Sequence, residues 1–289
     1  MQAERILITG ATGFIGRPLV KRLIADGVAV SALVREKPGA ARRDRLPDPV
    51  EVIECDLRYA AGVKRAIMFT APALVLHLAA VGVTDPFLST TEALRGNLDA
   101  TINLLKAVAG RCRVILARTS SEIDLLNPYA ASKAAAWQFG RMFHRTEGWP
   151  IVGAMVFQAY GPGQSERTAL GAALKAARAG EPFPMTSGEQ RRDWIYIDEV
   201  VDGILAAAGA GNIEGETIEI GTGIATPVRA VVARVFQLAG QGQPLIGALP
   251  QRPGETLEQV ADASRAEKLT GWRTRIGIEE GLQKVLEHE

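Results

Sequence analysis

Apolar residues in the first half of the chain fall into short runs separated by stretches with helical period. The runs are rich in β-branched and aliphatic residues and cover Arg5 to Thr9, Val28 to Val34, Val50 to Cys55, Ala73 to Ala79, Arg113 to Arg118 and Ile151 to Phe157. The clearest helix covers Glu92 to Ala109, where an apolar residue returns every three or four positions. This alternation predicts an α/β fold with a doubly wound parallel sheet of Rossmann type.

The pattern becomes irregular after residue 160, where a smaller C-terminal lobe is expected to begin. We predict helices over Ala169 to Arg178 and Asp198 to Ala208, and a strand over Thr217 to Ile220 that returns to the main sheet. Residues 1–160 should therefore form the main domain, to which residues 193–221 return. Residues 161–289 should mainly form the lobe.

Two helices near the C-terminus have clear boundary signals. Thr226 offers an N-cap, Pro227 sits at the first helical position, and Gly240 follows the last turn. Asp262 and Gly271 bracket a further helix in the same way. A different signal marks residues 38–49, a loop rich in Arg and Pro that is predicted to be mobile.

The charge balance argues against a polyanionic partner. With 33 basic and 32 acidic residues, the formal net charge of +1 creates no field that would attract nucleic acid or an anionic membrane. The N-terminus lacks the features of a secretion signal, and the most apolar run, Ala73 to Val83, is shorter than a membrane span. Cys55 and Cys112 are interpreted as buried, reduced thiols of a cytoplasmic protein. The histidines match no metal-ligand spacing, so no metal is expected.

A glycine-rich turn directly follows the first strand and leads into a helical run. Its three glycines, spaced by three, permit a tight turn and a close approach of the backbone to a pyrophosphate at the helix N-terminus. Turns also collect glycine for steric reasons, but the place between strand and helix favours a dinucleotide site. The predicted cofactor-binding residues of this turn are Gly10, Thr12, Gly13, Phe14, Ile15 and Gly16.

The end of the second strand bears on which dinucleotide is bound. An acidic residue there favours the free 2′-hydroxyl of NAD(H), and a basic one favours the 2′-phosphate of NADP(H). The strand ends in Leu33-Val34-Arg35, with no acidic residue before Glu36. Arg35 therefore favours NADP(H), with NAD(H) as the alternative if Arg35 is a solvated loop charge.

A Tyr and a Lys four residues apart open a helix behind Pro128. On one helical face, the Lys133 ammonium can lower the pKa of the Tyr129 phenol, which can then exchange a proton with a substrate hydroxyl. Ser120, just past the fifth strand, is chosen over Thr119 and Ser121 as the hydroxyl that bonds the same substrate oxygen. The predicted catalytic residues are Ser120, Tyr129 and Lys133.

Together these motifs resemble the extended short-chain dehydrogenase/reductase superfamily, over nearly the whole chain. The family's adenine contact is similar to Asp56-Leu57, and its fourth-strand motif is similar to His77-Leu78-Ala79-Ala80. The family's helix centred on an asparagine resembles the segment around Asn97. The resemblance implies that Asp56, Leu57, Leu78, Ala79, Ala80 and Asn97 contact the cofactor together with Tyr129 and Lys133, and that His77 is a packing residue.

The C-terminal half resembles the nucleotide-sugar branch of this superfamily. The resemblance assigns Arg192 to the sugar-nucleotide diphosphate, a role that suits a guanidinium fork. It also implies substrate contacts for Gln158, Arg252 and Glu255. An alternative is a structural ion pair between Arg192 and Asp193.

The chain departs from the family in the connection to the tyrosine. Ser120 and Tyr129 are only nine residues apart, a much shorter connection than usual, and the Tyr-Gly dipeptide that often follows the hydroxyl is missing. Met155 replaces an Arg that is usual before the Phe of the sixth strand. Glu122 occurs in a Ser-Glu sequence found in dehydratases, decarboxylases and epimerases, so it does not decide the reaction.

The resemblance implies an enzyme acting at C4 of a nucleotide-activated sugar. We expect a 4-keto-sugar reductase, with a 4-epimerase or dehydratase that retains NAD as the alternative and a non-catalytic dinucleotide sensor as a distant one. We also expect a homodimer through Glu92 to Ala109 and Pro128 to Phe143, the family's usual four-helix contact. The apolar Trp137, Phe139 and Met142 are equally compatible with core packing.

Overall fold

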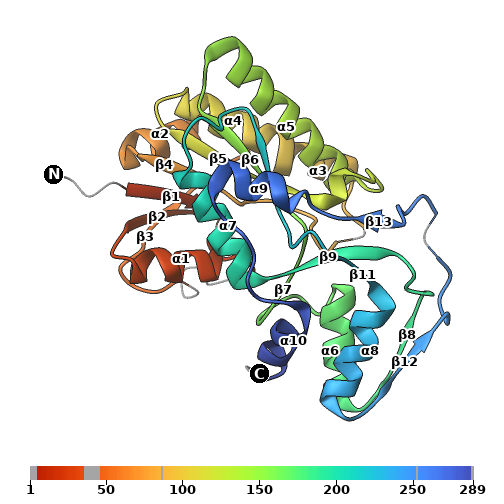
Figure 1. Ribbon diagram of the computed structural model, residues 1–289. Coiled ribbons are helices and arrows are strands. Elements are labelled where there is room, and N and C mark those ends of the chain that lie inside the picture. Colours follow the sequence, from red (N-terminus) through yellow and green to blue (C-terminus); the bar gives the residue numbers. More distant parts are fainter. Residues whose placement is uncertain (1–4, 36–45, 86, 252, 288–289) are drawn as a thin grey trace. The chain divides into compact units, whose positions relative to one another are not determined.

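The computed structural model describes residues 5–35, 46–85, 87–251 and 253–287 (Figure 1). These residues form two compact units, the first comprising residues 1–155 and 204–218 and the second residues 156–203 and 219–289. The predicted mobile loop lies mostly outside the described residues, since residues 38–45 are not among them.

A seven-stranded sheet organises the first unit, in the order β10-β6-β5-β4-β1-β2-β3. Its strands are β1 (Arg5–Thr9), β2 (Ala29–Val34), β3 (Glu51–Glu54), β4 (Leu74–His77), β5 (Arg113–Thr119), β6 (Ile151–Val156) and β10 (Thr217–Ile220). The pairs from β3 to β5 are all parallel. Because the strand order reverses between β1 and β4, a dinucleotide is expected at their carboxyl ends. The predicted doubly wound α/β fold is confirmed.

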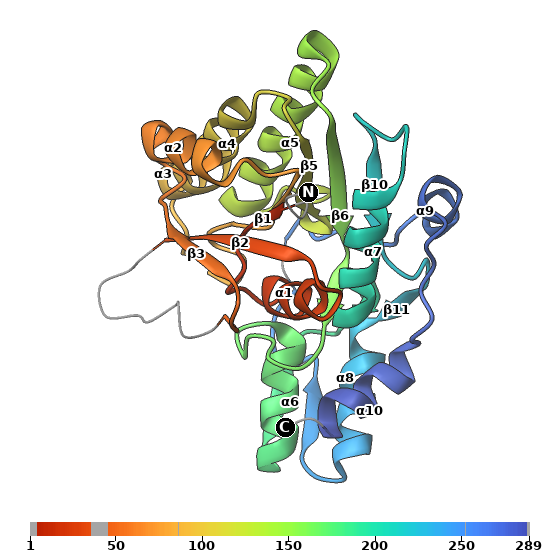
Figure 2. The ribbon, with the colours of Figure 1, turned by 90° about the vertical axis from the view of Figure 1, so that its left-hand side faces the viewer.

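Helices cover both faces of this sheet. Figures 1 and 2 show α2, α4 and α5 over one face and α1 over the other. The helical elements are α1 (Gly16–Ala25), α2 (Ala60–Thr70), α3 (Thr90–Ala93), the π-helical turn η2 (Leu94–Asp99), α4 (Ala100–Val108), the 3₁₀ turn η3 (Ser120–Glu122) and α5 (Pro128–Glu147).

The single regular helix predicted over Glu92 to Ala109 is wrong in one respect. The π-helical turn η2 interrupts it and shifts the register of the residues that face inward. Leu94, a member of the predicted apolar stripe, is 42% exposed, whereas the amide of Asn97 is buried. A periodicity of apolar residues does not reveal such a turn.

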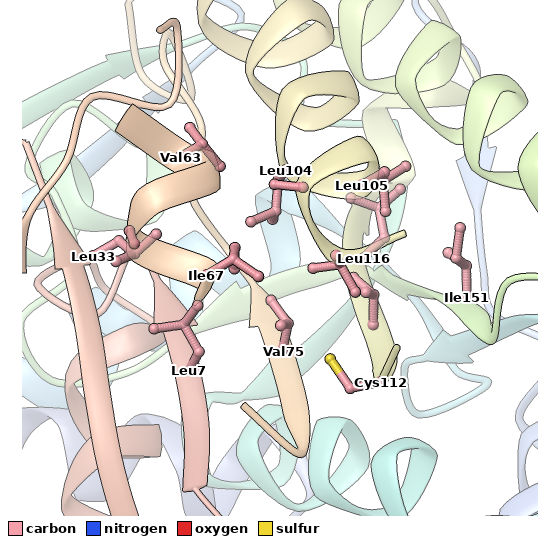
Figure 3. Packing of buried hydrophobic residues seen from close by; sticks show 14 of the residues in the cluster. Leu7, Leu33, Val63, Ile67, Val75, Leu104, Leu105, Cys112, Leu116 and Ile151 are labelled. Carbon is pink, nitrogen blue, oxygen red and sulfur yellow. The ribbon is translucent and has the colours of Figure 1, made fainter. Parts of the chain in front are cut away.

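The core of the first unit lies between the sheet and α2 and α4. Figure 3 shows strand residues such as Leu7 and Leu116 meeting Ile67 of α2 and Leu104 of α4, all fully or nearly fully buried. This contact leaves the carboxyl ends of the strands available for the site. Cys55 and Cys112 are free and buried, as predicted, and burial raises the pKa of each thiol to about 11.

The second unit is built from short strands and a helix pair. Its strands are β7 (Gln158–Tyr160), β8 (Pro182–Met185), β9 (Arg191–Tyr196), β11 (Ala225–Pro227), β12 (Gln243–Ile246) and β13 (Glu258–Gln259). Strand β9 pairs with β7, β11 and β13, and β8 pairs with β12. Its helices are α6 (Ala169–Ala179), α8 (Val228–Ala239), α9 (Ala263–Thr270) and α10 (Ile278–Glu287); α7 (Ile197–Gly209) has its first half in this unit. Helices α6 and α8 lie side by side (Figure 1).

The predicted helix boundaries in this unit are mostly confirmed. Asp262 caps α9 by accepting a hydrogen bond from the Arg265 N–H, and Gly240 and Gly271 adopt the left-handed conformation after α8 and α9. The prediction of Thr226 as an N-cap is wrong, because its backbone pairs with β9 and Pro227 takes the cap position.

The described residues contain neither a candidate membrane span nor a cluster of metal-ligating side chains. None of the helices there is both long and apolar enough to cross a membrane. Nor do His, Cys, Asp or Glu side chains in those ranges form a group of three that could hold a metal ion.

Candidate active site

The glycine-rich turn is packed too tightly for other residues at two positions. A Cβ atom on Gly10, whose φ is +74°, would lie 2.7 Å from the Ala79 nitrogen, and one on Gly16 would lie 2.2 Å from the Gly10 oxygen. The Gly13 N–H donates to the same Gly10 oxygen at 2.9 Å. Helix α1 then begins without a side-chain cap or an acidic residue in its first turn, which suits a bound phosphate.

A pocket of about 430 Å³ opens beside this turn, entirely within the first unit. This size suits part of a dinucleotide, and the glycine turn provides the close approach that a pyrophosphate requires. Every predicted cofactor-binding residue except Asn97 lines it: Gly10, Thr12, Gly13, Phe14, Ile15, Gly16, Arg35, Asp56, Leu57, Leu78, Ala79, Ala80, Tyr129 and Lys133. The pocket therefore joins the glycine turn to the Tyr/Lys pair.

Asn97 lies behind the pocket wall and not in it. Its amide donates to the Val81 carbonyl at 3.2 Å and to Ser132 Oγ at 2.9 Å, and its oxygen accepts from the Val81 N–H at 2.8 Å. Ser132 Oγ in turn donates to the Tyr129 carbonyl at 2.8 Å. Asn97 thus ties α5 to the pocket-lining segment after β4.

His77 is a buried structural residue, as the resemblance implied. Its ring nitrogens contact the hydroxyls of Thr9 at 2.6 Å and Thr101 at 2.9 Å. Burial lowers the pKa of His77 to about 3, and the charge of Lys133 adds to the effect. The imidazole is therefore neutral near neutral pH.

Two arginines stand where the pocket meets β2 and the residues after β3. Arg35 was predicted there, but Arg58 was not, and both line the pocket. Arg58 forms a two-donor contact with Asp56 at 2.5 to 3.0 Å, and these hydrogen bonds hold the pKa of the Asp56 carboxyl below its usual value. No motif marked Arg58, although its position two residues after the acidic residue is visible in the sequence.

The Tyr/Lys pair is placed by a well-capped helix. Asn127 accepts a hydrogen bond from the Ala130 N–H at 2.8 Å and starts α5, so that Tyr129 and Lys133 both reach the pocket. Burial lowers the pKa of Lys133 to about 8. In the described part of the chain its ammonium has no hydrogen-bond partner, so its donors are available to a ligand.

The expectation that Lys133 lowers the pKa of Tyr129 is not met. Burial raises the pKa of the phenol to about 12, a hydrogen bond with Thr119 opposes this, and the charge of Glu122 adds to the increase. Desolvation of the phenolate therefore outweighs the nearby groups. The phenol is protonated near neutral pH.

The hydroxyl beside the Tyr129 phenol belongs to Thr119, the last residue of β5. The predicted partner Ser120 is the first residue of η3 and is 6% exposed, and neither Ser120 nor Thr119 lines the pocket. The strand ends at Thr119, so Ser120 stays the predicted catalytic hydroxyl and Thr119 is an alternative.

An ion pair missed by the sequence reasoning lies next to these groups. Arg118 lines the pocket, and its Nε and Nη2 donate to Glu122 Oε2 at 3.0 and 2.6 Å. The Glu122 side chain is only 2% exposed. Charged residues four apart are common, so the sequence held no specific signal for a buried pair.

The predicted substrate residues Gln158, Arg192 and Glu255 belong to the second unit. Arg192 is buried and donates to Glu255 Oε1 at 2.7 Å and to the Thr256 carbonyl at 3.0 Å. It does not pair with Asp193, whose carboxylate accepts from the backbone of Thr222, Gly223 and Ala261. Gln158 begins β7, and Arg252 lies outside the described residues.

The doubly wound sheet, the glycine turn and the Tyr/Lys pair define a Rossmann-type dinucleotide enzyme of the extended short-chain dehydrogenase/reductase kind. Residues 6–221 match the model of the NAD dependent epimerase/dehydratase family. The chain belongs to this family, and the non-catalytic sensor is thereby set aside.

The chain is similar to characterised members over its full length. It is 29% identical to the UDP-glucose 4-epimerase of Mycolicibacterium smegmatis, over 98% of this chain and 97% of that protein. It is 25% identical to the dTDP-glucose 4,6-dehydratase of Xanthomonas campestris pv. campestris, over 97% of this chain and 92% of that one. The crystal structure of Thermus thermophilus UDP-glucose 4-epimerase with NAD superposes with a TM-score of 0.84 at 28% identity, over 98% of both chains.

Proposed function

We propose that this enzyme transfers hydride to or from C4 of a nucleotide-activated sugar. The observation that carries the proposal is one pocket with a phosphate-binding turn and the Tyr129/Lys133 pair in its wall. When bound, the nicotinamide cofactor supplies the hydride chemistry. Tyr129 exchanges the proton of the reacting oxygen, and Lys133 Nζ donates to the cofactor ribose.

Reduction of a 4-keto sugar is the direction that we favour. Arg35 supports this direction, because it favours NADP(H), and a cofactor that is consumed is typically NADPH, whereas an epimerase retains NAD. Epimerisation with retained NAD is the second candidate, since characterised relatives are UDP-glucose 4-epimerases.

A panel of nucleotide sugars tests the proposal. CDP-, dTDP-, GDP- and UDP-sugars, including 4-keto forms, are screened by thermal shift with each cofactor, and the ligands that raise Tm are assayed for turnover. A reductase consumes one NADPH per product, whereas an epimerase interconverts sugars without net consumption. If cofactors raise Tm and no sugar of the panel does so or reacts, the proposal fails.

We propose NADP(H) as the preferred cofactor because Arg35 and Arg58 both line the pocket near the end of β2. A guanidinium bonded to a phosphate contributes about 1.5–3 kcal/mol, or roughly 10- to 100-fold in affinity. Arg35→Ala should weaken NADP⁺ binding by about that factor and leave NAD⁺ binding within about threefold. Calorimetric titration of both cofactors measures this.

The control for this prediction is Arg22→Ala, which removes an exposed arginine of α1 that does not line the pocket. It should change neither dissociation constant. If the wild-type protein binds NAD⁺ as tightly as NADP⁺, or more tightly, the preference is wrong and Arg35 is a solvated loop charge.

The homodimer and the cytoplasmic location remain proposals. On the predicted contact helices, Trp137 is 3% exposed and belongs to the core, whereas Phe139 and Met142 are each 39% exposed. The apolar residues of α5 thus divide between the core and the surface. This division is compatible with a partner helix over the exposed side.

A further inference from the structure

Arg118 joins four elements of the first unit at the carboxyl end of β5. Besides its contact with Glu122 of η3, its Nη1 donates to Thr217 Oγ1 of β10 at 2.6 Å. Its guanidinium also lies 5.0 Å from the ring of Trp137 in α5. A planar fork with several donors suits such a site, and the side chain is only 11% exposed.

Glu122 uses both carboxylate oxygens within this arrangement. Oε2 accepts from Arg118, and Oε1 accepts from the Thr119 N–H at 3.1 Å. Thr119 therefore has its backbone held by Glu122, while its hydroxyl accepts from the Ser121 N–H at 3.3 Å and lies close enough to the Tyr129 phenol to lower its pKa. Both carboxylate oxygens therefore take part in holding the residues at the end of β5.

We propose that the Arg118–Glu122 ion pair positions the catalytic groups. It fixes the Thr119 hydroxyl beside the Tyr129 phenol and holds a negative charge near the Lys133 ammonium. The Arg118–Glu122 ion pair thereby restrains the short connection between β5 and α5. This inference rests on the proposed function for the roles of Tyr129 and Lys133, but it adds two residues that act through them.

The charge of Glu122 matters because Lys133 is buried. Desolvation favours the neutral amine, Glu122 opposes it, and Arg118 reinforces it. Among the described residues, the neutral His77 of β4 also interacts with Lys133, and Tyr129 of the same helix lines the same pocket. The negative charge of Glu122 is therefore what favours the protonated Lys133 that a ribose contact requires.

The test measures the titration of Lys133 by NMR of protein labelled with ¹³C at lysine Cε, so it needs no turnover. Its signal is assigned with Lys133→Arg. In wild type the pKa should be about 8. In Glu122→Gln, which keeps the side-chain shape and removes the charge, it should fall by about 1 unit.

The direction of this pKa change distinguishes an electrostatic role of Glu122 from a purely structural one. If Glu122 only holds the fold, its replacement lets water reach Lys133, and the pKa rises towards the ordinary lysine value. An unchanged or raised pKa in Glu122→Gln overturns the electrostatic role. Glu214→Gln is the control, because it breaks the Arg113 ion pair at the amino end of the same strand and should leave Lys133 unchanged.

Arg118→Lys tests the positioning role, including the case where Glu122→Gln does not fold. A lysine keeps the positive charge, so the pKa of Lys133 should stay close to wild type. A single ammonium group cannot replace the planar guanidinium, which donates to Glu122 and Thr217 at the same time. With the substrate found in the sugar panel, kcat should fall about 10-fold while KM stays near wild type. A wild-type kcat in a folded Arg118→Lys protein overturns the positioning role.

Discussion

Replacing Tyr129 by Phe should leave the protein folded and able to bind its cofactor, and should reduce kcat by about 10²- to 10⁴-fold. The substitution removes one hydroxyl from a ring that lies in the pocket wall, so packing is kept. Only the transferable proton is lost. Since the phenol acts on the reacting oxygen in the transition state, KM should change little.

The measurement is steady-state turnover with the sugar found in the panel, with chemistry shown to be rate-limiting. Tyr196→Phe is the matched control, because it removes a buried phenol hydroxyl in the second unit and should retain turnover. A Tyr129→Phe enzyme with more than about a third of the wild-type kcat would overturn the mechanism.

The fold could be predicted because it rests on local patterns. Each strand of the main sheet is a short apolar run, and the turn after β1 needs glycine for steric reasons that hold whatever the ligand. Parallel strands then bring residues such as Arg35, Asp56 and Ala79 to one edge. The pocket wall follows from this topology.

The groups around Tyr129 could not be predicted because they depend on where elements end. Whether Thr119 or Ser120 faces the phenol is decided by one residue at the end of β5 and by the tight turn η3. The burial of Arg118 depends on Thr217, about a hundred residues away in sequence. No local pattern contains such a contact.

The raised pKa of Tyr129 also could not be predicted from the local sequence. Spacing alone placed Lys133 on the same helical face as Tyr129, but it could not show the burial of the phenol or the carboxylate of Glu122 nearby. Spacing therefore predicts which groups meet. Their protonation depends on how the surrounding chain excludes water.

The second large effect on kcat is expected from the substitutions that decide whether Thr119 or Ser120 supplies the catalytic hydroxyl. Thr119→Val removes the hydroxyl that bonds to the Tyr129 phenol and keeps the β-branched shape at the end of β5. If this hydroxyl also polarises the reacting oxygen, its loss should reduce kcat by about 10²-fold, the effect of removing one oxyanion donor. Ser120→Ala should stay within about threefold of wild type.

Thr119→Ser tests whether a hydroxyl at position 119 is enough to restore the activity that Thr119→Val loses. It restores a hydroxyl at the same position, so it should recover most of the activity that Thr119→Val loses, whereas a defect of packing would persist in it. Both proteins should bind NADP⁺ like wild type, because Thr119 does not line the cofactor pocket. If Ser120→Ala loses more turnover than Thr119→Val, Ser120 is the catalytic hydroxyl.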